Sequence, residues 1–305
     1  MKITIILCTY NRCQSLGRAL ESAAALTLPD SDEWDVLVVD NNSNDQTQEV
    51  VQEFCDRYPG RFSCLFEPRQ GKSFALNSGI GKAQGDVLAF MDDDVEVDSN
   101  WLRHLTAPLN SGEWAGAGGR ILPEASFVPQ KWMDLGSRDG LAPLAMFDLG
   151  PEPGELKEPP FGTNMAFRKE LFVKYGSFRT DLGPQPGSEI RSEDSEFGSR
   201  LLAAGERLWY EPSAIVYHAI PQARIQKKYF QTWWFDKGRA DVRELGIPNV
   251  RWTIAGIPVY LFRRLVIWTL RWIMSAREPQ SFSRKLKAYY NAGITLECYK
   301  QADRT

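Results

Sequence analysis

Three consecutive carboxylates, Asp92, Asp93 and Asp94, directly follow the apolar segment Asp86–Met91. Adjacent carboxylates repel one another, so three of them at the end of a buried strand are costly unless a cation or solvent offsets their charge. Mg²⁺ and Mn²⁺ prefer oxygen ligands and commonly bind through one or two carboxylates together with substrate phosphates. The triplet therefore indicates a metal and phosphate site, although a solvated acidic loop is the alternative that the triplet alone would favour.

A second acidic pair, Glu193-Asp194, follows Ser192. A carboxylate in this setting can serve as a general base. The same three residues are also typical of a helix start, with an N-cap serine and acids that interact favourably with the helix dipole. His218 follows the strand-like segment Ala214–Tyr217, where a lone histidine is more often structural than a metal ligand. On local evidence alone, neither the acidic pair nor the histidine is assigned a chemical role.

The segments that carry these residues alternate between strand and helix patterns. Apolar or β-branched runs predict strands at Lys2–Cys8, Trp34–Val39, Phe62–Phe66 and Asp86–Met91. Leu16, Leu20, Ala23 and Ala24 recur at helical spacing, as do Val50, Val51, Phe54 and Tyr58, and Ser73–Ala83 forms a third predicted helix. This alternation predicts a parallel sheet with helices on both faces, which binds ligands beyond the carboxyl ends of its strands.

Polar residues stand at three of those predicted strand ends, in the sequences TYNR, DNNSND and DDD. The second cluster also begins a helix, and we expect Asn42 or Asn44 to provide its cap. Two phosphate-binding motifs are incomplete. Gly71-Lys72-Ser73 lacks the earlier P-loop glycine, because Phe66 occupies that position, and Gly116–Gly119 lacks the last glycine of a dinucleotide fingerprint. Neither an NTPase nor a Rossmann dehydrogenase is indicated.

The charge of the 305-residue chain is unevenly distributed. From Gln222 onward there are 16 basic and 6 acidic residues, whereas the preceding part has a formal charge of −13. An acidic body fits a cation site, and a basic, aromatic tail fits an anionic surface. The five cysteines form no Cys-x-x-Cys pair, and the N-terminal apolar stretch is short for a signal peptide. We therefore expect a cytoplasmic protein.

Taken together, the motifs resemble those of family 2 glycosyltransferases with the GT-A fold. The matching segments occur in the order ITIILCTYNR, VLVVDNNSNDQT, Gly71–Gly79, GDVLAFMDDDVEVDSNWL, GTNMAFRKE, RSEDSEFG and WYEPSAIVYHAIP. Several matches in the same order are far more specific than any single one. The resemblance covers residues 1–221 and implies an α/β fold with a mixed, mainly parallel sheet. Residues 222–305 depart from the family's pattern, and their basic and aromatic sequence predicts a helical extension.

The resemblance implies a nucleotide site at the first two strand ends, formed by Thr9, Tyr10, Arg12 and Asp40. The chemistry agrees for Asp40, since a carboxylate can accept the imide N–H of uracil. A turn or capping role is the structural alternative for this aspartate. A UDP-sugar is therefore the favoured donor.

By the same resemblance, the acidic triplet is the DxD element of the family. Asp94 is the expected ligand of a divalent cation, Mn²⁺ or Mg²⁺, while Asp92 or Asp93 contacts the ribose or sugar. His218 matches a histidine that many GT-A enzymes use as a second metal ligand. The cation would neutralise the diphosphate leaving group.

The acidic pair matches the family's catalytic position, so Asp194 is the expected base for the acceptor hydroxyl and Glu193 a supporting contact. Asn164, in the loop Gly162-Thr163-Asn164, is expected beside the donor sugar, since its amide can both donate and accept. Trp132 and the Gly- and Pro-rich segment Asp181–Arg191 are expected on the acceptor side.

These assignments predict an inverting glycosyltransferase that acts on a glycan or lipid-linked acceptor, in cell-surface polysaccharide synthesis. A sugar nucleotidylyltransferase and a non-catalytic nucleotide-sugar or carbohydrate-binding relative are the alternatives. The segment Ile257–Met274 places Arg263, Arg264 and Arg271 on one helical face, with Trp268 and Trp272 elsewhere on the helix. This pattern suits peripheral contact with the inner face of a membrane, and packing on the catalytic domain is the alternative.

Overall fold

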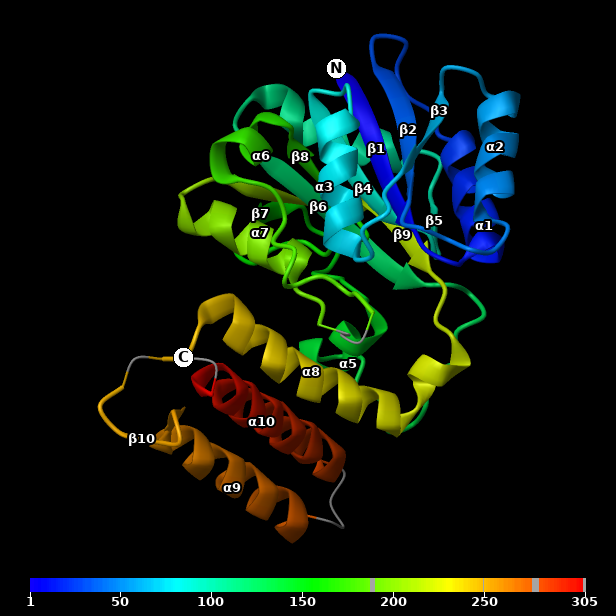
Figure 1. Cartoon of the computed structure of the whole chain (residues 1–305). Coiled ribbons are helices and arrows are strands. Elements are labelled where there is room, and N and C mark those ends of the chain that lie inside the picture. The colour runs from blue at the N-terminus through cyan, green and yellow to red at the C-terminus, as the bar shows by residue number, and fades with distance from the viewer. Residues whose placement is uncertain (187–189, 249, 276–279, 304–305) are drawn as a thin grey trace. The chain divides into compact units, whose positions relative to one another are not determined.

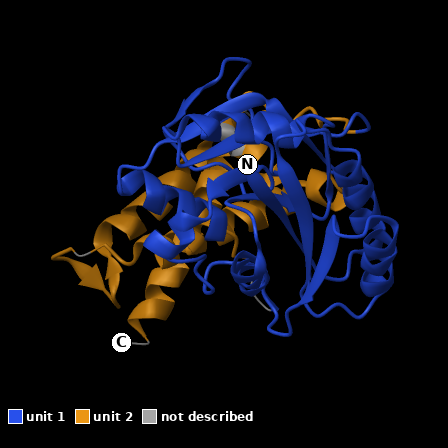
Figure 2. Ribbon diagram, turned by 90° about the horizontal axis from the view of Figure 1, so that it is seen from above, with its two compact units in different colours: residues 1–126, 145–186, 193–219 blue, residues 127–144, 187–192, 220–305 orange. Residues whose placement is uncertain are grey.

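The computed structural model describes residues 1–186, 190–248, 250–275 and 280–303 (Figure 1). The chain forms two compact units, which Figure 2 shows in different colours. Unit 1 consists of residues 1–126, 145–186 and 193–219, and unit 2 of residues 127–144, 187–192 and 220–305. The last crossing between them, at 219/220, lies near the predicted boundary at 221/222. Two earlier segments that the sequence placed in the catalytic domain belong to unit 2.

Unit 1 is built on a nine-stranded mixed sheet with the order β3-β2-β1-β4-β8-β6-β9-β5, and β7 pairs with β9. Its first half is parallel: β1 lies between β2 and β4, and β3 extends the edge. These strands confirm the expected α/β architecture, with bounds β1 Lys2–Thr9, β2 Glu33–Asp40, β3 Phe62–Phe66 and β4 Val87–Asp92. Because β1 and β2 are buried along most of their length, they read as continuous apolar runs.

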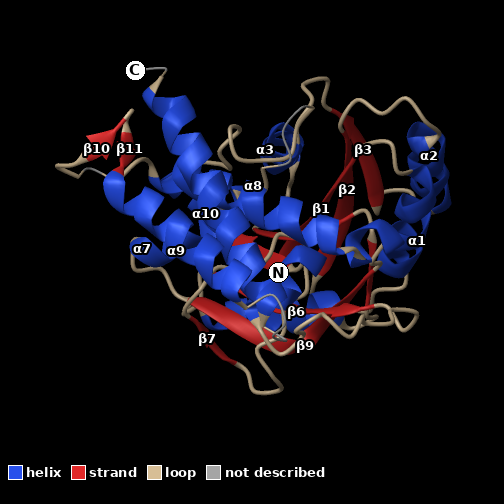
Figure 3. Ribbon diagram, turned by 90° about the horizontal axis from the view of Figure 1, so that it is seen from below, coloured by secondary structure: helices blue, strands red, loops and turns tan. Residues whose placement is uncertain are grey.

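Three helices cover this parallel half, α1 (Cys13–Ala24), α2 (Thr47–Arg57) and α3 (Lys72–Lys82). Helix α3 lies on one side of the strands, and α1 and α2 lie together on the other (Figures 1 and 3). Asp45, rather than Asn42 or Asn44, accepts the Thr47 amide at the start of α2, at 3.0 Å. Its second oxygen accepts the Cys13 amide at 3.1 Å, so one side chain supports the first turns of two helices.

The second half of the sheet is mixed. Strand β8 runs antiparallel to both β4 and β6, while β6 and β9 are parallel, with a register shift between Gly119 and Arg120. The strand bounds are β5 Val95–Val97, β6 Gly116–Pro123, β7 Gly154–Leu156, β8 Met165–Arg168 and β9 Leu208–His218. The helices of this half are α4 Trp101–Thr106, η1 Ala107–Ser111, α6 Glu170–Tyr175 and α7 Glu193–Ala203. They complete a single large apolar core.

Unit 2 is mainly helical. Its long helices are α8 (Lys227–Leu245), α9 (Val259–Met274) and α10 (Ser281–Ala302), and α10 lies between the other two (Figure 1). The shorter elements are α5 Arg138–Leu141, η2 Ala142–Leu144, η3 Gln222–Ile225, β10 Thr253–Ile254 and β11 Ile257–Pro258. Helices α8 and α10 approach closely at Gly238 and Gly293. A β-carbon at Gly293 would lie 1.9 Å from the Phe235 carbonyl oxygen, so the crossing requires glycine.

Candidate active site

The carboxyl ends of β1, β2 and β4 bring the predicted site residues to one edge of the sheet. Thr9 is the register partner of Asp40, and Cys8 that of Asp92. The strands are parallel neighbours, so their ends meet at the same edge even though 83 positions separate Thr9 from Asp92 in sequence. This edge holds the acidic triplet and the candidate nucleotide residues together.

Within the triplet, the middle carboxylate points inward. Asp93 is buried, accepts the Thr9 hydroxyl at 2.8 Å and pairs with the Arg12 guanidinium at 3.0 Å. Burial raises the pKa of Asp93 to about 6, against the opposing effect of Arg12. Asp92 and Asp94 remain as the two outer acids, as in a D-x-D pattern. The buried Asp93 therefore supports the turn that carries the triplet. Asp92 and Asp93 were both predicted to contact the ribose or sugar, and only Asp92 remains available to do so.

Asp94 lies beside the predicted histidine ligand. The Asp94 Oδ1 atom is 3.6 Å from His218 Nε2, and Asp94 Oδ2 is 2.7 Å from Arg12 Nη1. Pairing of β5 with β9 causes this approach, since Val95 is the register partner of His218. Two neighbouring ligand atoms on an octahedral Mg²⁺ or Mn²⁺ stand ~3 Å apart. The Asp94–His218 geometry therefore fits a shared cation after a small side-chain shift.

Further ligands for such a cation would have to come largely from the substrate. Among the residues that the structure describes, no group of three or more His, Cys, Asp or Glu side chains is arranged to hold a metal. Mg²⁺ commonly binds through only one or two protein carboxylates, with substrate phosphates and water completing its shell. A site in which Asp94 and His218 are the protein ligands is consistent with this small number of protein ligands.

Lys72, the lysine of the incomplete P-loop motif, lies inside the acidic site. Its ammonium nitrogen is 2.6 Å from Asp92 Oδ1 and 3.9 Å from Glu193 Oε1. Burial acts to lower the pKa of Lys72, but the charges of Asp92, Glu193 and Asp194 outweigh it and raise that pKa. Lys72 is thus a fixed cation between the two acidic motifs. Its place in the matched segment Gly71–Gly79, at the start of α3, was the available signal.

The loop Gly162-Thr163 connects the same two motifs by hydrogen bonds. Its Gly162 amide donates to Asp194 Oδ2 at 2.6 Å, and the Thr163 hydroxyl donates to Asp92. A β-carbon at Gly162 would lie 2.8 Å from Asp194 Oδ2, so only glycine allows this approach. Since the Ser195 amide also donates to Asp194 Oδ1 at 2.7 Å, both oxygens of this partly exposed carboxylate are oriented.

Glu193 differs from its neighbour in being almost fully buried. Burial and then the nearby Asp194 charge raise the pKa of Glu193 to about 7, although Lys72 acts to lower it. Glu193 and Asp194 therefore occupy distinct environments in the first turn of α7. The arrangement supports a proton-accepting role for Asp194 and a supporting position for Glu193.

Asn164 has no free polar group with which to contact a ligand. Its Oδ1 accepts the Trp101 indole N–H, and its Nδ2 donates to the Arg120 and Ala214 carbonyls, each at 2.8 Å. Its backbone amide and carbonyl are paired as well, with Phe161 and Gly119. The side chain is fully buried. The predicted contact of Asn164 with the donor is therefore replaced by a structural role, in which this residue anchors the loop that carries Gly162 and Thr163.

The remaining predicted nucleotide residues surround the β1 and β2 ends. Tyr10 is exposed, whereas Asp40 is buried and its Oδ1 accepts the Ser43 amide at 3.0 Å. Asn11 and Ser43 tie the two loops together, since the Asn11 amide donates to the Ser43 hydroxyl. A rigid frame thus supports Asp40.

Two predicted acceptor-side features lie partly or wholly in unit 2. Trp132 packs edge-to-face against Phe230 and Phe282, with ring centroids 5.0 Å apart in both pairs. An aromatic cluster therefore accounts for Trp132. The segment Asp181–Arg191 is divided between the units, and its residues 187–189 lie outside the described residues.

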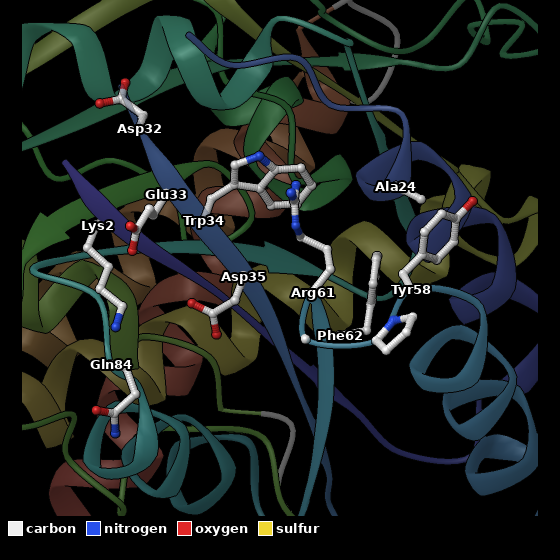
Figure 4. Close-up of a pocket in the computed structure, with 12 residues that line it drawn as sticks. Lys2, Ala24, Asp32, Glu33, Trp34, Asp35, Tyr58, Arg61, Phe62 and Gln84 are labelled. Carbon is white, nitrogen blue, oxygen red and sulfur yellow. The ribbon is translucent and has the colours of Figure 1, made fainter. Parts of the chain in front are cut away.

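A hollow of about 890 Å³ lies at the opposite edge of the sheet from the acidic site (Figure 4). Lys2, Glu33 and Asp35 line one part of it, and Trp34 and Arg61 another (Figure 4). The Arg61 guanidinium lies over the Trp34 ring, 3.9 Å from its centroid. None of the predicted catalytic, nucleotide or metal residues lines this hollow. This hollow is therefore separate from the candidate active site, which the convergent carboxylates define.

Comparison with known proteins agrees with this architecture. Residues 4–176, more than half of the chain, match the family model of glycosyl transferase family 2. The chain is 25% identical to glucosyl-dolichyl phosphate glucuronosyltransferase of Haloferax volcanii over 245 residues, covering 77% of this chain and 75% of that protein. It is 26% identical to succinoglycan biosynthesis protein ExoM of Rhizobium meliloti over 246 residues, covering 80% and 75%.

A solved structure shows the same fold. Mannosyltransferase PcManGT from Pyrobaculum calidifontis, in complex with GDP-Man and Mn²⁺, matches with a TM-score of 0.67 and 17% identity. The match covers 98% of this chain and 87% of that one.

Proposed function

This chain belongs to glycosyl transferase family 2, and we propose that it transfers a sugar, with inversion, from a UDP-sugar to a hydroxyl of a glycan or lipid-linked acceptor. The observation that carries the proposal is the joining of two acidic motifs at one sheet edge. Lys72 and the loop Gly162-Thr163 hold Asp92 and Asp194 together. The family assignment argues against a sugar nucleotidylyltransferase, and the intact carboxylates argue against a non-catalytic relative.

Asp40 and Asp94 are assigned to the two ends of the donor nucleotide. Asp40 Oδ1 already accepts the Ser43 amide, which leaves Oδ2 as the main acceptor for a base N–H. Uracil presents one such donor, its imide N–H, so a single oxygen suffices. Asp94 and His218 are assigned to a divalent cation, which when bound supplies positive charge to the diphosphate leaving group. Arg12, now paired with Asp93 and Asp94, adds a second positive charge beside them.

Asp194 is assigned as the general base. The amides of Gly162 and Ser195 fix its orientation, so its remaining lone pairs have a set direction. As the acceptor oxygen bonds to the anomeric carbon and the bond to the diphosphate breaks, the hydroxyl proton moves to Asp194. Lys72 neutralises charge among the acids and keeps Asp92 in place for the donor.

The acceptor class is proposed from the relatives. One acts on a glucosyl-dolichyl phosphate and another belongs to succinoglycan biosynthesis, by their names. A lipid-linked or growing cell-surface glycan is therefore the acceptor that we propose. A lipid-linked acceptor would be used at a membrane, so peripheral membrane contact through the C-terminal helices forms part of the proposal.

Thermal shift measurements with UDP and GDP, with and without Mn²⁺, test the donor assignment. Binding to the folded state raises the melting temperature. UDP should raise the melting temperature more than GDP does, and it should do so only when Mn²⁺ is present. Asp94→Asn should abolish this dependence on the metal. Glu96→Gln is the matched control, because it removes an exposed carboxylate from β5, the short strand that begins directly after Asp94. A wild-type response to UDP that is equal in EDTA and in Mn²⁺ would contradict the metal assignment.

A further inference from the structure

One face of α9 exposes a row of aliphatic side chains. Val259, Val266, Leu270 and Ile273 follow helical spacing and are all exposed, and Met274 at the helix end is exposed to 84%. Aliphatic residues at such spacing normally face a core. Here they lie on the surface, in a row along one face of the helix.

The opposite side of α9 already supplies the packing that the helix needs. Leu261 is buried in the core of unit 2, and Phe262 is partly buried against it. The Trp268 ring lies under Lys287 of α10, and the Trp272 ring under Lys285, each at 4.9 Å. The exposed row is therefore additional to the contacts that hold α9 on α10.

The charged side chains of α9 itself are all positive. Helix α9 contains no acidic residue, and Arg263 lies within the apolar row while Arg264 and Arg271 flank it. Lys285 and Lys287 of α10 add two more positive charges beside the tryptophans of α9. The hairpin before α9 also exposes Trp252 and Ile254. Apolar side chains bordered by arginine, lysine and tryptophan match the boundary between lipid headgroups and acyl chains.

We propose that this face of α9, the row Val259, Val266, Leu270 and Ile273 with its three arginines, binds the surface of an anionic lipid bilayer, with the helix lying in the headgroup plane. None of the helices in the described part of the chain is both long and apolar enough to cross a membrane. A helix that lies in the headgroup plane does not have to cross the bilayer, because it buries only its exposed row. The arginines would meet lipid phosphates.

Charge also favours a bilayer over a second copy of the chain. A two-fold symmetric contact would place the same patch of both copies face to face. Arg263 would then lie within an interface that offers no acidic partner from α9. An anionic lipid surface supplies the missing negative charge and accepts the aliphatic row at the same time. The inference specifies the surface for the proposed membrane contact, but it does not rest on glycosyl transfer.

Sedimentation with vesicles tests the proposal on the full chain. At low salt, wild-type protein should sediment with vesicles of phosphatidylcholine containing roughly one third phosphatidylglycerol, and much less with pure phosphatidylcholine. The double variant Val266→Asp/Leu270→Asp should bind at least tenfold more weakly. The double variant Val128→Asp/Val173→Asp is the control, since it adds the same two negative charges at exposed aliphatic positions outside α9. This control should bind like wild type.

A second set of variants separates specific charge from net charge. The triple variant Arg263→Glu/Arg264→Glu/Arg271→Glu should remain in the supernatant with anionic vesicles. The same change in net charge at Lys82, Arg103 and Lys157, all exposed on unit 1, should leave most of the binding intact. Equal loss in both triple variants would overturn the assignment to α9, as would wild-type protein that stays in the supernatant.

Two further measurements complete the test. Light scattering over a range of concentrations detects self-association. A wild-type dimer that becomes monomeric in the Val266→Asp/Leu270→Asp variant would show that a second copy covers the row, and would overturn the bilayer assignment. UDP binding with Mn²⁺ should be unchanged in the α9 variants. If wild-type protein does not bind UDP, the donor assignment alone is contradicted. The vesicle measurement still tests the α9 surface by itself.

Discussion

Replacing Lys72 with methionine removes the ammonium group that lies 2.6 Å from Asp92 and 3.9 Å from Glu193. Methionine keeps a long apolar side chain, so little packing is lost. Removing one partner of a fully buried ion pair costs about 3–5 kcal/mol, because the other charge stays buried. The side chains of Lys72 and Asp92 are 27% and 25% exposed, so solvent screens part of the effect. We expect Lys72→Met to lower the free energy of unfolding by about 2 kcal/mol.

The stability lost in Lys72→Met should be greater at higher pH. The pKa of Glu193 is raised to about 7 in the folded state, from an ordinary value of 4.5. A carboxyl with a raised folded-state pKa contributes full stability below its unfolded pKa, and loses that contribution as the pH rises through the folded pKa. Lys72 acts to lower the pKa of Glu193, so its removal raises that pKa further. The destabilisation should therefore be larger at about pH 8 than at about pH 5, by roughly 1 kcal/mol.

Urea unfolding of the wild type, Lys72→Met and Lys72→Arg at both pH values measures the effect. The arginine variant keeps the positive charge and should recover at least half of the lost stability. Donor binding with Mn²⁺ should weaken in the methionine variant, because Asp92 loses the group that orients it. Equal stability of the methionine variant and wild type at the higher pH, or a greater loss at the lower pH, would refute the reasoning.

The other predictions concern three further contacts. Asp194→Asn should reduce transfer by roughly 10²-fold or more with donor affinity nearly unchanged; near-normal turnover on the acceptor would leave Asp194 as a helix-terminus carboxylate only. Asn164→Ala should lower the free energy of unfolding by about 2–3 kcal/mol, because it leaves the Trp101 indole and two carbonyls without partners. A denaturant titration that shows a loss below about 0.5 kcal/mol would contradict this prediction. Glu297→Gln should destabilise unit 2 by about 1–2 kcal/mol, since Glu297 is buried between Arg239 and Arg243. Thermal unfolding that is unchanged in this variant would argue against that contribution.

Local patterns in the sequence were sufficient for the first half of the fold. The apolar runs that predict strands correspond to β1 to β4 within one or two residues, and the helical spacing of Leu16 and Leu20 corresponds to α1. Burial on both faces of a parallel sheet selects apolar residues at every position of a strand. Because that constraint acts on neighbouring residues, it can be read without knowing the fold, and so can the polar strand ends that converge at the site.

The direction of each side chain depended on distant partners and could not be read in the same way. Asp92, Asp93 and Asp94 are chemically identical in sequence, yet Thr9 and Arg12 draw Asp93 inward while Lys72 holds Asp92. The polar groups of Asn164, which the sequence left free for a ligand, are likewise taken up by hydrogen bonds to Trp101 and to the irregular pairing of β6 with β9.

The same holds for the helices of unit 2. The sequence of α9 showed arginines and tryptophans on a helix, with membrane contact and packing on the protein both open. Tertiary packing placed Leu261 in the core and left Val266 and Leu270 exposed. The periodicity of a helix determines which residues share a face, because it follows from local geometry. Which face is covered depends on neighbours brought close by the whole fold, and therefore only the tertiary structure decided it.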